Sequence, residues 1–381
     1  MRTIGIVTTS RADYNIYRPL ITALSKSRCK VILFVTGMHF DARFGNTVRA
    51  IEQSRGLEIV RVPVTMKDSA VGTAAAMGEV TTKLAVAFDR RRPDILVTLG
   101  DRFEMHAAAV AAVVINIPVA HLHGGELTYG AFDEVFRHSL TKMARLHFVS
   151  TKEYGRRVIQ MGEHPKTVFV TGAPGLDNII AEPLLSRKQL AEAYDINAST
   201  PYVLITWHAV TLEQEKTAEY TDAVLSALET LKGYNLIFTA PNADTGGDLI
   251  RKNIKAFIRR HSHAQYVDNF GKGYLSAVKY ASALVGNSSS GLIEAPSFAV
   301  PVLNVGSRQD GRAKPKNVVD AVCSRAGIMK GLKTVLSSGF ALKLKGMRNI
   351  YGDGHASPKI ARVLATVDIS TLRIKRFHDI D

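Results

Sequence analysis

Cysteine is almost absent from this sequence: only Cys29 and Cys323 occur in 381 residues. Two cysteines so far apart give neither a CxxC metal-binding spacing nor a disulfide framework, and they agree best with a reducing compartment. The amino-terminal run Met1–Ser10 is short and is closed by Arg11 and Asp13, which is typical of a first β-strand rather than an export signal. We therefore expect a cytoplasmic protein.

Long hydrophobic runs are also missing. The segment 105–125 carries no Asp, Glu, Lys or Arg, but Asn116 and Pro118 interrupt it. An Ala/Val-rich helix followed by a buried strand explains this segment better than a membrane span does. We expect no association with a membrane.

Acidic residues are outnumbered, with 34 Asp and Glu against 49 Lys and Arg and a net charge of +15. A basic surface attracts anions, and nucleic acid is the first candidate. However, the basic residues are scattered, and the Lys- and Arg-rich tail 343–376 is not interleaved with stacking aromatic residues. The sequence therefore predicts no nucleic-acid partner.

Short runs rich in Val and Ile alternate with helical patterns along the chain, which predicts parallel sheets covered by helices on both faces. The length suits two domains, and Gly172–Gly175 marks a hinge between two such series. We expect an α/β fold with domains 1–174 and 175–357. The predicted strands are 3–9, 30–36, 58–64, 95–99, 118–123, 147–150 and 167–171, then 202–207, 235–238, 265–267, 283–285 and 300–304.

Three common motifs are absent: the GxGxxG dinucleotide fingerprint, the GxxxxGK[ST] phosphate loop and the HExxH zinc motif. The informative residues are instead those that follow the predicted strands, because doubly wound sheets bind ligands at the carboxyl ends of their strands. The side chains at these positions indicate whether the protein is an enzyme, a binding protein or a purely structural one.

In the first half, Arg11 stands before a helix and could bind a phosphate or form a surface pair with Asp13. His39 follows the second strand. Asp101 follows Gly100 and could transfer protons or cap the next helix. Alternation places His121 and His123 on one side of a strand. A helix that begins near Asp133 could line the same pocket with Asp133, Glu134, Arg137 and His138, although Glu134 and His138 could also be an ordinary i, i+4 pair. With no third histidine nearby we expect no metal.

In the second half, His208 and Asn242 follow strands, and the run Asn287–Gly291 precedes a helix predicted over Leu292–Phe298. Small hydroxyl residues at a helix start can bind a phosphate, although they can also form a plain N-cap loop. Glu294 could accept hydrogen bonds from a ribose diol, and Arg308 supplies a further guanidinium for an anion.

Taken together these segments resemble the UDP-N-acetylglucosamine 2-epimerase family, and above all its hydrolysing branch, which feeds sialic acid and related nonulosonic acid synthesis. The resemblance runs in order from about Gly5 to Arg312. It is carried by Ser10-Arg11-Ala12-Asp13-Tyr14, Gly100-Asp101-Arg102, His121–Glu126, Pro241-Asn242-Ala243-Asp244, Asn287–Gly291 and Gly306-Ser307-Arg308.

The resemblance implies a GT-B fold, with two Rossmann-like doubly wound domains, the active site in the cleft between them, and a C-terminal helix (about 358–381) returning to the first domain. It implies that the diphosphate is held by Arg11, Ser288, Ser289 and Arg308. Asp13 would also bind the substrate. Glu294 would hold the ribose, and His208 and Asn242 would line the UDP-sugar cleft. Catalytic roles would fall to Asp101, His39, Arg102, His121 and Asp133.

The implied chemistry removes the proton at C2 with loss of UDP, adds water at C1 and reprotonates C2 from the opposite face, with no cofactor. Some relatives carry Glu where this sequence has His123, so the second acid/base is His123, Glu126 or Asp133. We expect UDP-N-acetylglucosamine to yield N-acetylmannosamine and UDP. The alternatives are UDP-2,4-diacetamido-2,4,6-trideoxyglucose as substrate, or a GT-B glycosyltransferase. The family also implies a homo-oligomer, a dimer or tetramer.

Overall fold

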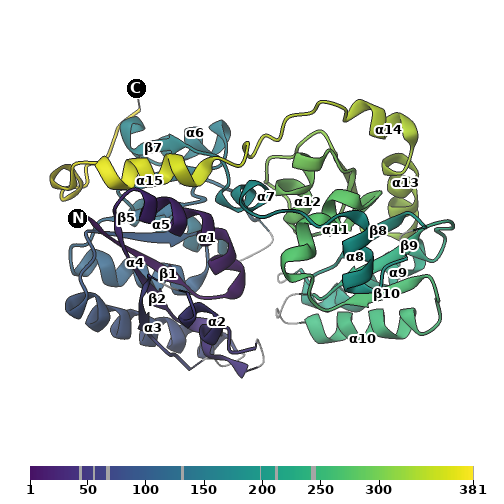
Figure 1. Cartoon of the computed structure of the whole chain (residues 1–381), viewed down its shortest axis with the longest axis horizontal. Helices are drawn as coiled ribbons and strands as arrows, with labels where there is room; N and C mark the ends of the chain where they lie inside the picture. The colour runs from purple at the N-terminus through teal and green to yellow at the C-terminus, as the bar shows by residue number, and fades with distance from the viewer. Residues whose placement is uncertain are drawn as a thin grey trace. The chain divides into compact units, whose positions relative to one another are not determined.

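The computed structural model describes the whole chain except residues 43–44, 55, 66–68, 130–132, 198, 211–212, 242–245 and 381. The chain forms two compact units, each built on its own sheet (Figure 1). The first unit comprises residues 1–126, 132–181 and 351–381, and the second comprises residues 127–131 and 182–350.

The first unit contains a seven-stranded parallel sheet in the order β3-β2-β1-β4-β5-β6-β7. Its central strands are almost wholly buried, as expected for a parallel sheet covered on both faces. The strands are β1 (Thr3–Thr8), β2 (Lys30–Val35), β3 (Glu58–Arg61), β4 (Ile95–Leu99), β5 (Val119–Leu122), β6 (Leu146–Val149) and β7 (Val168–Val170). The helices are α1 (Arg11–Lys26), α2 (Val48–Glu52), α3 (Ala70–Arg90), α4 (Phe103–Val114), α5 (Asp133–Met143), α6 (Lys152–Gln160), α7 (Asn178–Ala181) and α15 (Ala356–Thr366).

The second unit repeats the same plan with a six-stranded parallel sheet in the order β10-β9-β8-β11-β12-β13. Its last strand and three of its helices, α8, α13 and α14, were not predicted from the sequence. The strands are β8 (Tyr202–Thr206), β9 (Asn235–Thr239), β10 (Ala264–Val267), β11 (Ala283–Gly286), β12 (Val302–Val305) and β13 (Val318–Ala321). The helices are α8 (Arg187–Tyr194), α9 (Thr217–Leu228), α10 (Gly247–Ile258), α11 (Tyr274–Tyr280), α12 (Ser290–Ile293), α13 (Arg325–Val335) and α14 (Ser338–Lys343).

The chain returns to the first unit at its carboxyl end, where α15 lies alongside α1 (Figure 1). Asp177 caps α15, since its carboxylate accepts hydrogen bonds from the backbone N–H groups of Ala356 (2.9 Å) and Ser357 (2.5 Å). The helix ends at Thr366, short of the expected residue 381, and the tail continues as a 3₁₀ turn and an extended segment. The first unit keeps residues up to Ala181 because the segment after the hinge packs on α1.

Two predicted helix boundaries are wrong for local reasons. The sequence predicts that the first helix spans Asn15–Ser25, after Arg11, but α1 begins at Arg11 itself because Ser10 and Asp13 form a capping box. The helix predicted over Leu292–Phe298 is a single α turn, α12, followed by a 3₁₀ helix at Ala295–Phe298. Pro296 has no backbone N–H to donate to an α-helical ladder, so the α-helix stops before it.

No helix in the described part of the chain combines the length and the apolar composition needed to cross a bilayer.

Candidate functional site

Most of the polar residues singled out from the sequence lie at or just beyond the carboxyl ends of strands in the middle of each sheet, close to the point where the sheet changes winding direction. In the first sheet that point lies between β1 and β4, and in the second between β8 and β11. Ligands bind at this position in doubly wound sheets. We describe each unit separately.

Behind β1, Asp13 shapes the turn into α1. Its Oδ2 accepts hydrogen bonds from the backbone N–H of Thr9 (3.0 Å), the hydroxyl of Thr9 (2.6 Å) and the N–H of Ser10 (3.1 Å). Asp13 is buried, and its hydrogen bonds give it a structural role in the turn between β1 and α1. Arg11 is exposed at the first position of α1 and makes no hydrogen bond or ion pair with the described residues.

Two of the predicted histidines are buried and held by hydrogen bonds at both ring nitrogens. His39 contacts the hydroxyls of Thr8 (2.9 Å) and Thr47 (2.7 Å), and burial lowers its pKa to about 4. His121 donates from Nε2 to the carbonyl of Gly100 (2.7 Å) and contacts Thr141 through Nδ1, and burial lowers its pKa to about 3. Both are therefore neutral at pH 7 and brace the strand ends.

Behind β4, Asp101 and Arg102 have separate partners. Arg102 forms a two-pronged ion pair with the fully buried Glu104, at 2.9 and 3.1 Å. Asp101 accepts a hydrogen bond from Arg137 on α5, and Arg137 also donates to the backbone carbonyl of His123 (3.0 Å). One buried guanidinium thus joins the end of β4 to the end of β5, with the Asp101 side chain 23% exposed and available to a ligand.

Asp133 begins α5 close to this cluster. Burial raises its pKa to about 6, and the negative charge of Asp101 contributes to the rise. Two neighbouring carboxyl groups therefore differ in their environments: Asp101 is paired with a guanidinium, whereas Asp133 keeps its proton up to a higher pH than an ordinary aspartate. Carboxyl groups separated in this way are typical of acid–base sites.

Behind β5, His123 and Glu126 form a hydrogen-bonded pair. The His123 Nδ1 lies 2.7 Å from Glu126 Oε1, and the hydroxyl of Ser150 donates to the same oxygen at 3.0 Å. Glu126 is only 2% exposed. Of the three candidates for a second acid/base, His123 and Asp133 are partly exposed, whereas Glu126 is buried and hydrogen-bonded to His123 and Ser150.

In the second unit, Asn287 connects the ends of β8 and β11. Its side chain accepts from the backbone N–H of His208 and donates to its carbonyl, both at 2.8 Å. Gly286 precedes it at a φ of +136°, where a Cβ atom would lie 1.9 Å from the carbonyl oxygen of Thr206. Burial lowers the pKa of His208 to about 3, so this histidine is neutral.

The remaining predicted residues of the second unit surround the same loop. Arg308 donates to the backbone carbonyl of Asn287 at 3.1 Å, and Ser288 and Ser289 are partly exposed on the loop. Glu294 has a buried carboxylate oxygen, Oε2, without a hydrogen-bond partner among the described residues, and burial raises its pKa to about 7. Such an oxygen can accept a hydrogen bond from a hydroxyl group of a ligand. Asn242 lies outside the described residues.

Sequence reasoning placed Arg137 near the pocket without naming its partners, and it assigned no role to two further residues that organise the site, Glu104 and Ser150. Arg137 is the largest fully buried side chain, and a buried arginine needs acceptors, so it signals the Asp101 pair. The Arg102-x-Glu104 spacing is a local hint for the second pair. Ser150 gives no such hint, because its contact with Glu126 spans 24 residues of sequence.

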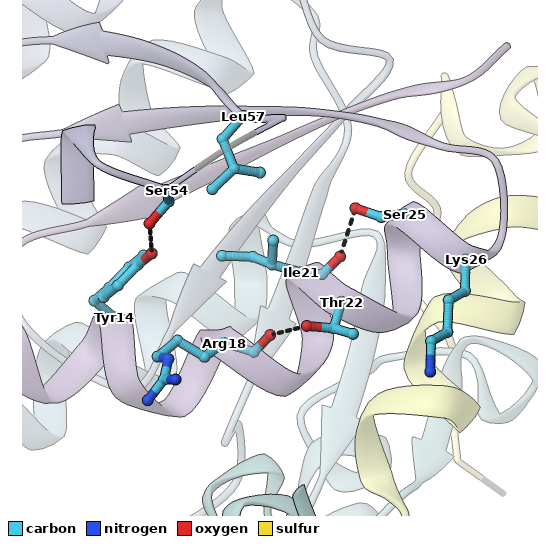
Figure 2. Close-up of a pocket in the computed structure, with 8 residues that line it drawn as sticks. All are labelled: Tyr14, Arg18, Ile21, Thr22, Ser25, Lys26, Ser54 and Leu57. Atoms are coloured by element: carbon cyan, nitrogen blue, oxygen red, sulfur yellow. Dashed lines mark hydrogen bonds between the residues drawn. The ribbon is translucent and has the colours of Figure 1, made fainter. Parts of the chain in front are cut away.

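One hollow, of about 510 Å³, lies beside α1 and not at the strand ends (Figure 2). Tyr14 reaches across to Ser54 at 2.8 Å, and Arg18 lies on the same flank of the helix. None of the residues predicted for the site lines it, so we assign it no part in the chemistry. Among the described residues no three His, Cys, Asp or Glu side chains gather as they would around a metal ion.

The fold and the site define an α/β protein with two Rossmann-like units, each carrying polar residues at its switch point. Comparison with known proteins is more specific. The family model for UDP-N-acetylglucosamine 2-epimerase matches residues 22–365, and the chain belongs to this family of enzymes.

Two curated bacterial proteins resemble it over nearly their full lengths. The polysialic acid biosynthesis protein P7 of Escherichia coli is 35% identical, with 100% of this chain and 98% of the relative covered. The hydrolysing UDP-N,N'-diacetylbacillosamine 2-epimerase of Legionella pneumophila is 36% identical, with 97% of each covered. The predicted relation to the hydrolysing branch is thereby confirmed.

A solved structure confirms the fold. The UDP-N-acetylglucosamine 2-epimerase of Neisseria meningitidis, crystallised with UDP-N-acetylglucosamine, superimposes with a TM-score of 0.82 at 17% identity, covering 96% of this chain and 99% of that one. The predicted GT-B architecture, with two parallel sheets each covered by helices, is correct.

Proposed function

We propose that this protein is a hydrolysing 2-epimerase that converts UDP-N-acetylglucosamine into free N-acetylmannosamine and UDP. The observation that carries the proposal is the pair of carboxyl groups Asp101 and Asp133, one salt-bridged to Arg137 and the other with a pKa raised to about 6. Inversion at C2 needs one group that removes a proton and another, on the opposite face, that returns one, and this carboxyl pair supplies one of the two.

The proposed reaction has two stages. Removal of the C2 proton and breakage of the bond between C1 and the UDP oxygen release UDP and leave a glycal-like intermediate. Water then adds its oxygen to C1, and C2 receives a proton on the opposite face. The departing diphosphate is negative, and the exposed Arg11 of the first unit and Arg308 of the second are the cations that we assign to it.

The uridine side of the substrate is assigned to the second unit. The Oε2 atom of Glu294 is buried and has no hydrogen-bond partner among the described residues. A ribose hydroxyl that donates to this oxygen would supply the missing partner, which supports the assignment. Ser288 and Ser289 supply hydroxyl groups to the diphosphate. The site requires no redox cofactor or metal for this chemistry.

A second substrate is favoured by one observation. The Legionella pneumophila relative, 36% identical over 97% of this chain, is named for UDP-N,N'-diacetylbacillosamine. The two sugars differ at C4 and C6, and a site built to bind a hydroxyl discriminates strongly against an analogue without it. Measuring kcat/KM for both UDP-sugars decides between them.

The fate of the anomeric bond is tested by incubation in H₂¹⁸O followed by mass spectrometry of the products. Hydrolysis places the label at C1 of a free sugar, in step with UDP release. An unlabelled, UDP-linked epimer would instead identify the non-hydrolysing reaction, and transfer of an intact sugar to an added acceptor would identify a glycosyltransferase.

A further inference from the structure

The end of β5 carries a side-chain arrangement that the carboxyl pair does not account for. His123 Nδ1 lies 2.7 Å from Glu126 Oε1. The Ser150 hydroxyl, at the end of β6, lies 3.0 Å from the same oxygen and 3.0 Å from the same ring nitrogen. Three polar side chains from two neighbouring strand ends therefore meet at a single carboxylate oxygen.

The arrangement leaves only one of the three groups able to reach a ligand. Glu126 is 2% exposed and Ser150 3% exposed. The His123 side chain keeps 11% of its surface exposed, and its Nε2 has no hydrogen-bond partner among the described residues. A carboxylate that accepts the Nδ1 proton leaves Nε2 with a lone pair, which is the form of imidazole that removes a proton.

The backbone at His123 is also held in an uncommon conformation. Its φ is +63°, a region that costs free energy for residues other than glycine and is found more often at functional sites. Its N–H donates to the carbonyl of Phe148 at 3.0 Å, and its carbonyl accepts from Arg137 at 3.0 Å. The same Arg137 holds Asp101, so the imidazole and that carboxylate are positioned by one side chain.

We propose that His123 is the general base that removes the C2 proton through Nε2, and that Glu126 and Ser150 are positioning residues that fix its tautomer and orientation. This inference rests on the proposed epimerase reaction. The C2–H bond breaks, its electron pair forms the C1–C2 double bond, and the C1–oxygen bond electrons leave with UDP. The imidazolium that forms is stabilised by the Glu126 carboxylate.

Glu126 therefore acts through the histidine and not on the sugar. A carboxylate in this position raises the stability of the imidazolium and excludes the tautomer with its proton on Nε2. Replacing it by an amide removes the charge and preserves the shape, so an amide variant separates the electrostatic role from a role in folding.

The first experiment uses His123→Gly in the full-length protein. Glycine tolerates the positive φ and leaves room for free imidazole. We expect kcat for UDP release to fall by ~10²–10⁴-fold, free imidazole to restore at least ten-fold of it, and UDP affinity by calorimetry to stay unchanged. If the glycine variant does not fold, His123→Asn replaces it, since asparagine also tolerates positive φ.

The second experiment compares pH profiles of kcat. Glu126→Gln is expected to lower kcat by ~10²-fold or more with little change in KM, and to move the acidic limb of the profile to lower pH, because the imidazolium loses its counter-charge. The His261–Glu229 pair of the second unit, 3.1 Å long, supplies matched controls. His261→Gly and Glu229→Gln should keep the wild-type kcat and pH profile and show no response to imidazole.

The outcomes are decisive. A folded, UDP-binding His123 variant that keeps wild-type kcat, or a glycine variant that imidazole does not activate, overturns the assignment. So does a Glu126→Gln protein with an unshifted pH profile. A wild-type protein that releases no UDP from any UDP-amino sugar refutes the proposed function itself, which is a different result from an active wild type with an inert His123.

Discussion

At the scale of single residues, the same side-chain type serves different purposes according to its burial and partners. His39 and His121 are enclosed and neutral, whereas His123 keeps an edge exposed. The Asp13 carboxylate accepts hydrogen bonds from backbone N–H groups of a turn. Asp101 is paired with a guanidinium, and 23% of its side chain stays exposed. Exposure and unused hydrogen-bonding capacity separate the reactive groups from the structural ones.

Asp101→Asn should fold normally and lose most turnover. The amide can still accept the Arg137 hydrogen bond, so the fold should be kept, but the buried guanidinium loses its counter-charge and the variant should be less stable than wild type. The amide cannot exchange a proton, and such a group typically contributes ~10²–10⁴-fold. Steady-state kinetics with circular dichroism tests this, with the exposed Asp89→Asn as control. A folded Asp101→Asn protein with near-normal kcat would remove Asp101 from the proton-transfer steps.

Glu294→Gln should make stability less dependent on pH. The folded-state pKa of about 7 lies above the unfolded value of 4.5, so the contribution of Glu294 to stability is greatest below pH 4.5 and is lost as the pH rises through 7. The full difference corresponds to about 3 kcal/mol at most. Relative to wild type, the glutamine variant should gain stability between pH 5 and pH 8, measured by thermal unfolding.

The same variant should bind UDP more weakly, because the amide offers a poorer acceptor for a ribose hydroxyl. Calorimetry at pH 8 measures this loss. Parallel pH–stability curves for the two proteins would show that Glu294 does not titrate in this range, and unchanged UDP affinity would leave its ribose role unsupported.

At the scale of elements, the carboxyl-terminal tail is tied to the catalytic helix and its neighbouring strand. The buried Glu163 binds Lys375 of the tail (2.6 Å), Lys142 of α5 (2.7 Å) and His147 of β6 (2.9 Å). Burial by itself would raise the Glu163 pKa, but these partners lower it to about 2. The tail therefore fastens α5, the helix that carries Asp133 and Arg137.

Glu163→Gln should destabilise the first unit by about 3 kcal/mol at pH 7, since it weakens the hydrogen bonds of the buried carboxylate to the partly exposed Lys142 and Lys375. The wild-type contribution is present above pH 4.5 and is lost as the pH falls toward 2, because the folded pKa is lowered. Thermal unfolding at pH 7 tests this.

The matched control for that change is Glu153→Gln, whose exposed pair with Arg157 should be worth less than about 1 kcal/mol. Equal melting temperatures for the Glu163 and Glu153 variants would show that the tail does not depend on this cluster.

At the scale of the whole molecule, the proposed reaction requires residues of both units to bind the same UDP-sugar. Arg11→Ala in the first unit and Arg308→Ala in the second should each weaken UDP binding, by about 10-fold or more for the loss of a charged hydrogen bond. Calorimetric titration with UDP measures both, and Arg362→Ala on the exposed face of α15 is the control. Unchanged affinity in both arginine variants would contradict the shared-substrate proposal.

The oligomeric state stays a prediction, a homodimer or homotetramer, and sedimentation of the purified protein measures it.

The sequence by itself determined the two-sheet architecture and the location of the candidate site. Parallel strands buried on both faces appear as short Val- and Ile-rich runs, and the residues that follow them must gather at one edge of each sheet. The predicted strand Ile95–Leu99 matches β4 residue for residue, and Asp101 follows from its end. The strand β13 escaped notice because it is half-exposed and only four residues long.

Only the tertiary structure distinguishes the gathered residues that stay accessible to a ligand from those that are enclosed. The contacts that matter join residues distant in the chain: Arg137 to Asp101, and Ser150 to Glu126 beside His123. Such contacts leave no local periodicity in the sequence, and pKa values depend on burial and neighbours that exist only in the folded chain. The choice of His123 over Glu126 therefore came from folded geometry, because burial and two hydrogen bonds occupy the carboxylate while one nitrogen of the imidazole stays open.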